Sequence, residues 1–239
     1  AFTPLATTKA WNWQQGAQLQ WTPHDPDSFV FNIRLGDGRP ACCIMTRSGH
    51  ATSIIEHPIY SLHPTQPIAL TLSYGRLTRL RPEYGYLGLA DPHAADPAPT
   101  ADGIFRLDLL TASHELIVPI AAVAAIKPSP MSHGAHHYVN HLMFNRSGSR
   151  FCFLHRFQRP DGITHSRLFT ADADGSRLRL LYEGMVSHYH WKDDATLLAW
   201  AGRRSLLGGS AKPGPLSFAR RALKPIYYAL GKPRFLMSR

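Results

Sequence analysis

The chain has 239 residues, of which 44% are hydrophobic and 18% charged, a composition that fits a globular protein with a buried core and excludes disordered, collagen-like and membrane-spanning classes. The net charge of +10 belongs to the C-terminal segment, because residues 1–194 carry 17 basic and 16 acidic residues while residues 195–239 carry nine basic residues and no acid; a nucleic-acid-binding surface on the body is therefore not expected. Three cysteines, two of them adjacent, do not make a disulfide framework and favour a reducing, cytoplasmic location.

Short β-prone runs separated by turns follow one another along the chain. An apolar or aromatic residue, a polar turn and a β run occur together four times, at Trp21, Leu62, Phe144 and Trp191, which is typical of hairpins. The intervals of 41, 82 and 47 residues resemble those of propeller blades, each built from several strands. The pattern predicts an all-β propeller with about four visible blades; an antiparallel sandwich is the alternative.

Other segments complete the expected organisation. Residues 89–101 form a loop of low order, either an insertion on one blade or a hidden weak repeat, and residues 120–126 form a short helical turn between blades. We expect a flexible break over residues 208–215, and Ser217 can cap a short basic helix that Pro225 ends. We expect propeller blades over residues 1–201, and over residues 202–239 a basic linker with a helical segment that precedes a further blade.

Five stretches occur in an order that resembles one bacterial group: TKAWNWQQG at 8–16, RPEYGY at 81–86, HYVNHLMF at 137–144, FLHR at 153–156 and MVSH at 185–188. The group consists of propeller proteins with TolB-like or WD40-like repeats, encoded near surface-polysaccharide genes and distantly similar to oligogalacturonate and ulvan lyases. Its members have six or seven blades, so the resemblance implies that this chain is a fragment of such a ring.

The resemblance implies a role in acidic polysaccharide metabolism, as a lyase that cleaves uronate-containing glycans by β-elimination. That reaction needs a cation to neutralise the carboxylate and a base to take the adjacent proton. We expect His141 to be the base and Arg156 the cation, assisted by His188 and Tyr138, because blade starts face a common channel. The expected substrate-binding residues are Trp11, Asn12, Gln14, Asn140, His155 and Arg81.

Each expected role has a structural alternative. His141 can be a structural histidine bonded to a backbone carbonyl, Arg156 can pair with an acid of a neighbouring blade, and Trp11 can be buried at a blade interface. The spacing of His188 and His190 places both rings on one side of a strand, where they can hold a divalent metal such as manganese if other blades supply further ligands.

The alternative function is a non-catalytic propeller that binds glycans or scaffolds glycosyltransferases, since this fold supports both activities. The expected partner is an acidic oligosaccharide or polysaccharide, with glycosyltransferases of the same pathway as protein partners. Nucleic acid is not an expected partner. Membrane contact is expected at most through the basic tail around Arg220, Arg221 and Lys224.

Overall fold

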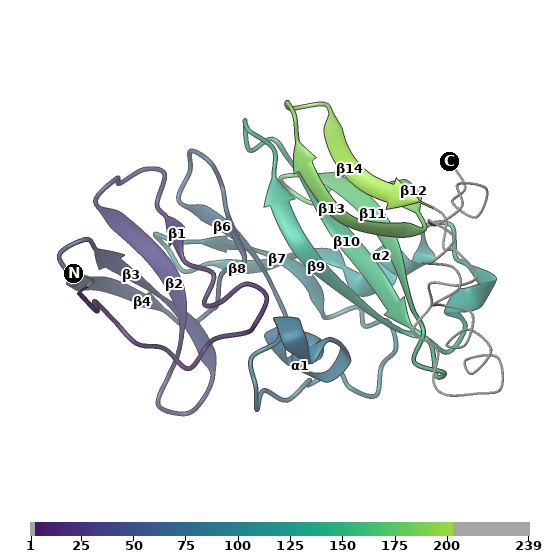
Figure 1. Ribbon diagram of the computed structural model, residues 1–239, viewed down its shortest axis with the longest axis horizontal. Coiled ribbons are helices and arrows are strands. Elements are labelled where there is room, and N and C mark those ends of the chain that lie inside the picture. Colours follow the sequence, from purple (N-terminus) through teal and green to yellow (C-terminus); the bar gives the residue numbers. More distant parts are fainter. Residues whose placement is uncertain (1–2, 203–239) are drawn as a thin grey trace, which may run out of the picture.

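The computed structural model describes residues 3–202, and their strands form four antiparallel sheets (Figure 1). The first sheet comprises β1 (Gln20–Trp21), β2 (Ser28–Arg34), β3 (Pro40–Thr46) and β4 (Ala51–Ile55). The second comprises β5 (Ser61–Leu62), β6 (Ile68–Leu72), β7 (Gly103–Asp108) and β8 (His114–Pro119). The third comprises β9 (His136–Phe144), β10 (Arg150–Gln158), β11 (Thr164–Asp172) and β12 (Arg179–Glu183). In the fourth, β13 (Met185–Trp191) pairs with β14 (Leu197–Gly202).

Within each sheet, every strand pairs with the next strand along the chain, so each sheet is an up-and-down meander. The four residues that marked the sequence repeat occupy one equivalent place, because Trp21, Leu62, Phe144 and Trp191 are the last residues of β1, β5, β9 and β13. The predicted hairpins and the mostly β architecture are therefore confirmed. The interval of 82 residues is long because it holds a 30-residue insertion within the second sheet, residues 73–102, and the link to the third.

Alternating side chains pack the sheets against one another. In β10, Phe151 and Phe153 belong to the cluster shared with the second sheet and its insertion, whereas Cys152 and Leu154 belong to the cluster shared with β13. Successive residues of a strand point to opposite faces, so a strand that is covered on both faces is apolar throughout. A separate cluster around Leu107 joins the first and second sheets.

The insertion begins with α1 (Tyr74–Leu80) and η1 (Pro82–Tyr84), and α1 was not predicted from the sequence. Its N-cap is Ser73, whose hydroxyl accepts a hydrogen bond from the Arg76 backbone N–H at 3.2 Å, the usual way to satisfy a free donor at a helix start. A Cβ atom on Gly75 would lie 2.0 Å from the carbonyl oxygen of Ala90. Only glycine therefore lets the helix lie this close to residues 89–101.

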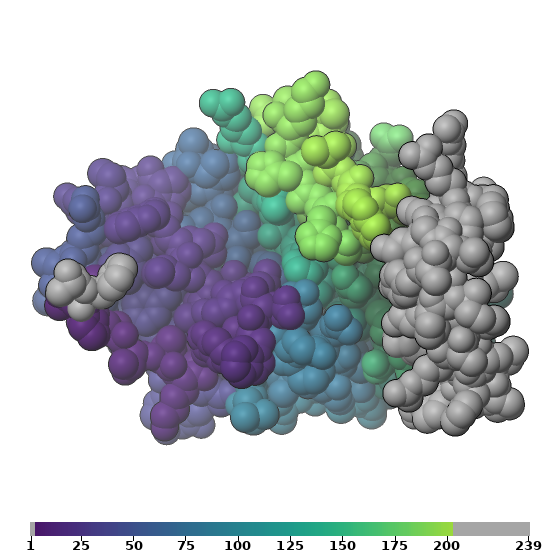
Figure 2. Space-filling view, in the orientation of Figure 1, coloured from purple at the N-terminus to yellow at the C-terminus, as the bar shows by residue number. Residues whose placement is uncertain are grey.

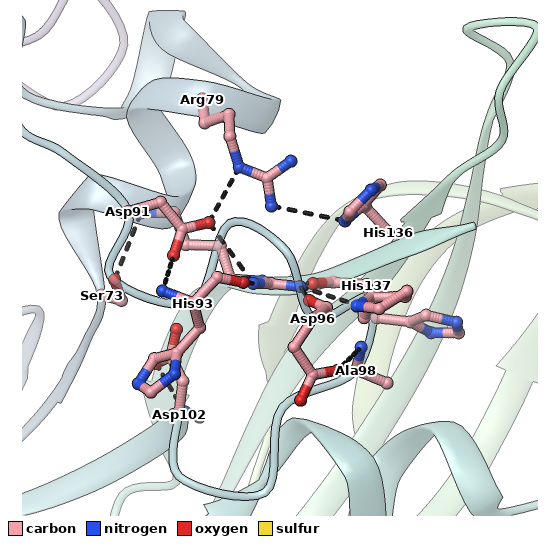
Figure 3. Close-up of polar contacts among 12 residues, drawn as sticks. Ser73, Arg79, Asp91, His93, Asp96, Ala98, Asp102, His136 and His137 are labelled. Atoms are coloured by element: carbon pink, nitrogen blue, oxygen red, sulfur yellow. Dashed lines mark hydrogen bonds and ion pairs between the residues drawn. The ribbon is translucent and has the colours of Figure 1, made fainter. Parts of the chain in front are cut away.

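A buried arginine holds the segment that was expected to have low order. Arg76 is 1% exposed, and its guanidinium donates to the carboxylate of Asp91 at 3.3 Å and to the backbone carbonyls of four residues, His93, Asp96, Pro97 and His137. Arg79 donates to the same carboxylate at 2.9 Å (Figure 3). Residues 89–101 contain no helix or strand, yet these contacts hold them against α1 and the start of β9.

Two short helices, α2 (Ile120–Ala125) and η2 (Pro130–Ser132), link the second sheet to the third. The helical turn predicted at residues 120–126 is thus confirmed. The predicted flexible break and the helix capped by Ser217 lie outside the described residues. Within residues 3–202, no helix is long and apolar enough to cross a membrane, and the three cysteines are buried and free.

Candidate functional site

The first strands of neighbouring sheets are joined by hydrogen bonds that converge on His141. A β-bulge interrupts the pairing of β9 with β10 at this residue, and His141 has a φ of 56°, a left-handed conformation that histidine adopts more readily than most residues. The bulge frees its backbone groups for other partners. The N–H donates to the Tyr60 hydroxyl at 2.8 Å, and the carbonyl accepts from the Tyr189 hydroxyl.

These contacts also include the N-terminal segment. The Tyr60 hydroxyl donates to Gln15 Oε1 at 2.7 Å, and the Asn12 side-chain amide donates to the Tyr84 carbonyl at 3.2 Å. Figure 2 shows the purple N-terminal segment beside the blue atoms of the α1 region and close to the yellow-green β13–β14 hairpin. The N-terminal segment is therefore bonded to the segments around Tyr60 and Tyr84, which lie far from it in the sequence.

Arginine and histidine side chains lie near enough to the His141 ring to affect its protonation. The pKa of His141 is lowered to about 4, first by burial and then by the charges of Arg156, His188 and Arg81. The ring meets Tyr84 edge-on, with centroids 4.9 Å apart. We call the two arginines, Arg81 and Arg156, together with the nearby His141 and His188, the cationic cluster. The structure thus brings together four of the residues that the sequence analysis selected.

Arg156 lies opposite Tyr138 in the pairing of β10 with β9. It makes no salt bridge within residues 3–202, and its buried Nε atom has no hydrogen-bond partner there. Arg81 Nε is 3.6 Å from Glu83 Oε2, and about half of each side chain is exposed. The attraction within this ion pair is therefore weak, because water screens it. The expected alternative, an acid of a neighbouring sheet paired with Arg156, is not found among the described residues.

Two buried polar groups of β9 adjoin the cluster. The Tyr138 hydroxyl has no partner within residues 3–202, and burial raises its pKa, so it keeps its proton. The charge of Arg156 partly opposes that rise. Asn140 is fully buried, and both polar atoms of its side chain lack a partner there. Unpaired buried groups of this kind are uncommon and are often found at functional sites.

The N-terminal residues divide into exposed and structural ones. Trp11 is 46% exposed and packs edge-on against Trp13, which is 81% exposed; Trp11 is therefore not buried between sheets. Asn12 is buried, and its side-chain Oδ1 accepts hydrogen bonds from the backbone N–H groups of Gln14 and Gln15. Asn12 thus shapes the turn that presents the two tryptophans, while Gln14 is exposed.

His155 does not join the cluster. It is fully buried, and its Nε2 atom lies 2.9 Å from Nδ1 of His137. Burial lowers its pKa well below the usual value, and the nearby charges of His137 and Arg167 act in the same direction. His155 and Arg156 are adjacent in β10, so their side chains point to opposite faces of the sheet. His155 therefore has no exposed surface with which to make the expected contact with substrate.

The histidine pair of β13 lies on the exposed face of the fourth sheet. His188 and His190 are both exposed, and the residues paired with them, Trp200 and Leu198, are 59% and 74% exposed. Within residues 3–202, no group of three or more His, Cys, Asp or Glu side chains could hold a metal ion. Among these residues, the pair therefore lacks the further ligands that the expected manganese site needs.

Sequence analysis missed the two tyrosines that hold His141. Tyr60 lies two residues before Leu62, and Tyr189 lies two residues before Trp191. Both therefore occupy the same position relative to the repeat residue. This equivalence could have indicated that the two tyrosines make similar contacts between neighbouring sheets. Only the structure shows that both hydroxyls bond to His141.

No protein-family model and no curated protein matches the chain. Among solved structures, one described as "putative TolB from Agrobacterium tumefaciens" is similar over 74% of this chain and 52% of its own length, with 15% sequence identity and a TM-score of 0.40. The chain therefore spans about half the length of that structure.

Proposed function

We propose that the four sheets are successive blades of a β-propeller and that the cationic cluster binds an acidic oligosaccharide. Consecutive meanders of up to four strands are the building unit of propellers. The first strands of neighbouring sheets are joined to one another, as the inner strands of neighbouring propeller blades would be. The side chain of Gln20 in β1 bonds to the backbone of Leu62 in β5, and the hydroxyls of Tyr60 and Tyr189 bond to the backbone of His141 in β9.

The observation that carries the proposal is that Arg156 has no acid partner within residues 3–202 and lies near His141, whose ring contacts Tyr84, over which Arg81 lies at 5.8 Å. An arginine that lacks an internal partner can bind a carboxylate through two parallel hydrogen bonds. Trp11 and Trp13 offer exposed aromatic faces on the segment whose Asn12 bonds to Tyr84, and such faces pack against the apolar side of a sugar ring. A uronate residue presents both features, a carboxylate and a ring.

β-Elimination is the second candidate function, and the neutral imidazole of His141 favours it. Arg156 would pair with the uronate carboxylate, and His141 would take the proton from the adjacent carbon. The C–H electron pair would form the new C=C bond while the C–O bond to the leaving sugar breaks, and a water molecule would protonate the leaving oxygen, because the Tyr138 hydroxyl is buried. A bound carboxylate would offset the positive charges around His141 and raise its pKa, making it a better base.

Calorimetric titration of the full chain with a galacturonate oligomer tests the binding proposal. Arg156→Gln should weaken binding about tenfold or more, because a charged hydrogen bond contributes about 1.5–3 kcal/mol. Arg179→Gln is the matched control, since Arg179 lies at the other edge of the same sheet and should leave binding unchanged. Binding that survives Arg156→Gln, or equal binding of a neutral glucose oligomer, would disprove the proposal.

The ultraviolet absorbance of the unsaturated uronate product tests elimination separately. Absorbance should rise with the wild-type chain and not with His141→Asn, which removes the base while Asn still tolerates the left-handed backbone. A flat trace from a chain that binds the oligomer would reject the lyase and retain the binding function.

A further inference from the structure

A second candidate site lies apart from the cationic cluster, where the first and second sheets meet the insertion. A cavity of about 270 Å³ opens there. Its walls include Pro40 of the first sheet, Thr71 and Phe105 of the second, and Asp102 at the end of the insertion. Thr71 and Phe105 are paired across β6 and β7, so their side chains share one face of the sheet.

Two buried polar groups line this cavity without partners. Asp102 is 2% exposed; its Oδ1 atom accepts from the Gly103 backbone N–H at 2.7 Å, while Oδ2 has no partner within residues 3–202. Thr71 is 1% exposed, and its hydroxyl also lacks a partner there. A buried acceptor left in this way costs about 1–3 kcal/mol. A ligand that donates a hydrogen bond to Asp102 would remove that cost.

The nearby arginines do not neutralise Asp102 directly. The side-chain hydrogen bonds of Arg76 go to Asp91 and to backbone carbonyls, and Arg79 bonds to Asp91 as well. Burial raises the pKa of Asp102, and the hydrogen bond from Gly103 and the charge of Arg76 only partly offset this rise. Figure 3 shows His93, which also lines the cavity, beside Asp102.

Three parallel rings form the other wall. The ring of His114 stacks between those of His57 and Phe105, with centroid distances of 3.9 and 4.4 Å and interplanar angles of 12° for both pairs. Burial lowers the pKa of His114 to about 4, so its ring is neutral near pH 7 and supplies no cation to Asp102. The cavity therefore combines one free carboxylate oxygen with an aromatic wall.

We propose that this cavity binds a small organic cation, an amine or amidine carried on a flat ring. The protonated nitrogen would donate to Asp102 Oδ2, and the ring would lie against the stack of His57, His114 and Phe105, where cation–π attraction adds to the contact. An anion would be repelled by Asp102. The charge of this site is opposite to that of the cationic cluster, so this proposal does not depend on glycan binding.

Benzamidine is the probe, with benzamide as its neutral and benzoate as its anionic counterpart. Each is titrated against the full chain by calorimetry and by saturation-transfer NMR. Benzamidine should bind with a millimolar or tighter Kd, and the other two should not bind. Asp102→Asn should weaken binding at least tenfold and His114→Ala severalfold. Asp96→Asn is the control, because Asp96 is exposed and does not line the cavity.

Three results would overturn the proposal: no binding of benzamidine at tens of millimolar, equal binding of benzamide or benzoate, or unchanged affinity in both cavity variants. Circular dichroism establishes that each variant is folded. His114 is exposed and makes no side-chain hydrogen bond within residues 3–202. His114→Ala therefore tests the site even if Asp102→Asn impairs folding.

Discussion

Replacing Arg76 with methionine should strongly destabilise the protein. Methionine has a similar length and fills the same space, but it cannot donate hydrogen bonds. The substitution would leave the Asp91 carboxylate, which is fully buried, with Arg79 as its remaining ion-pair partner. It would also remove the donor from four backbone carbonyls of the insertion and β9.

The size of the effect follows from these contacts. Breaking a buried ion pair by removing one partner costs about 3–5 kcal/mol. For a chain of this length, each kcal/mol lowers Tm by about 2–4 °C, so Arg76→Met should lower Tm by about 6–20 °C. Arg79→Met is the matched control. The Arg79 side chain is 29% exposed, and its loss leaves Asp91 paired with Arg76, so it should cost about 1 kcal/mol or less.

Urea unfolding followed by circular dichroism measures both variants, and limited proteolysis reports on residues 89–101. The Arg76 variant should be cleaved there faster than wild type, because its anchors are gone. Asp91→Asn added to Arg76→Met should recover part of the lost stability, since the uncompensated charge disappears. A loss below about 1 kcal/mol for Arg76→Met, or equal losses for the two arginine variants, would refute the view that Arg76 anchors the insertion.

Two further predictions concern packing and pH. Gly75→Ala should cost about 1–3 kcal/mol, because its Cβ would meet the Ala90 carbonyl, whereas Gly36→Ala has open space and should cost far less; similar Tm values for the two variants would contradict the close approach of α1. Stability should fall from pH 7 to pH 5, because the pKa of His141 is about 4 in the folded chain and near 6.5 when unfolded, so the unfolded state binds more protons in this window. His141→Asn should reduce that loss by about 1–2 kcal/mol, and an unchanged pH dependence of Tm would show that His141 does not titrate as the structure requires.

Local patterns were sufficient for the repeat and for the strands beside it, but they did not predict β3 or β4 of the first sheet. The residue that ends the first strand of each sheet could be found from the sequence. Its pattern, an apolar residue followed by a polar turn and a β run, involves only residues that are close together in the chain. The same reasoning missed α1, whose start is signalled by Ser73 alone, and it selected His155 without showing that this side chain points into the core.

All four residues of the cationic cluster were selected from the sequence, whereas their proximity was not predicted. Repeat positions indicate which residues occupy equivalent places, so His141, Arg156 and His188 could be selected from three different sequence stretches. The packing of the sheets decides how close these residues lie, whether Arg156 has an ion-pair partner and how far Trp11 is exposed. The local sequence carries no signal for any of these three properties.

The sequence by itself determined the alternation of the strands, the turns between them and the position of the basic charge, because each depends on residues close together in the chain. Tertiary structure alone decided which buried polar groups have partners. Arg76 bonds to a carbonyl 61 residues away, and the hydroxyl that receives the His141 N–H is 81 residues away. The unpartnered oxygen of Asp102 is likewise visible only once the sheets and the insertion are packed, because burial and hydrogen bonding are properties of the surroundings rather than of the residue.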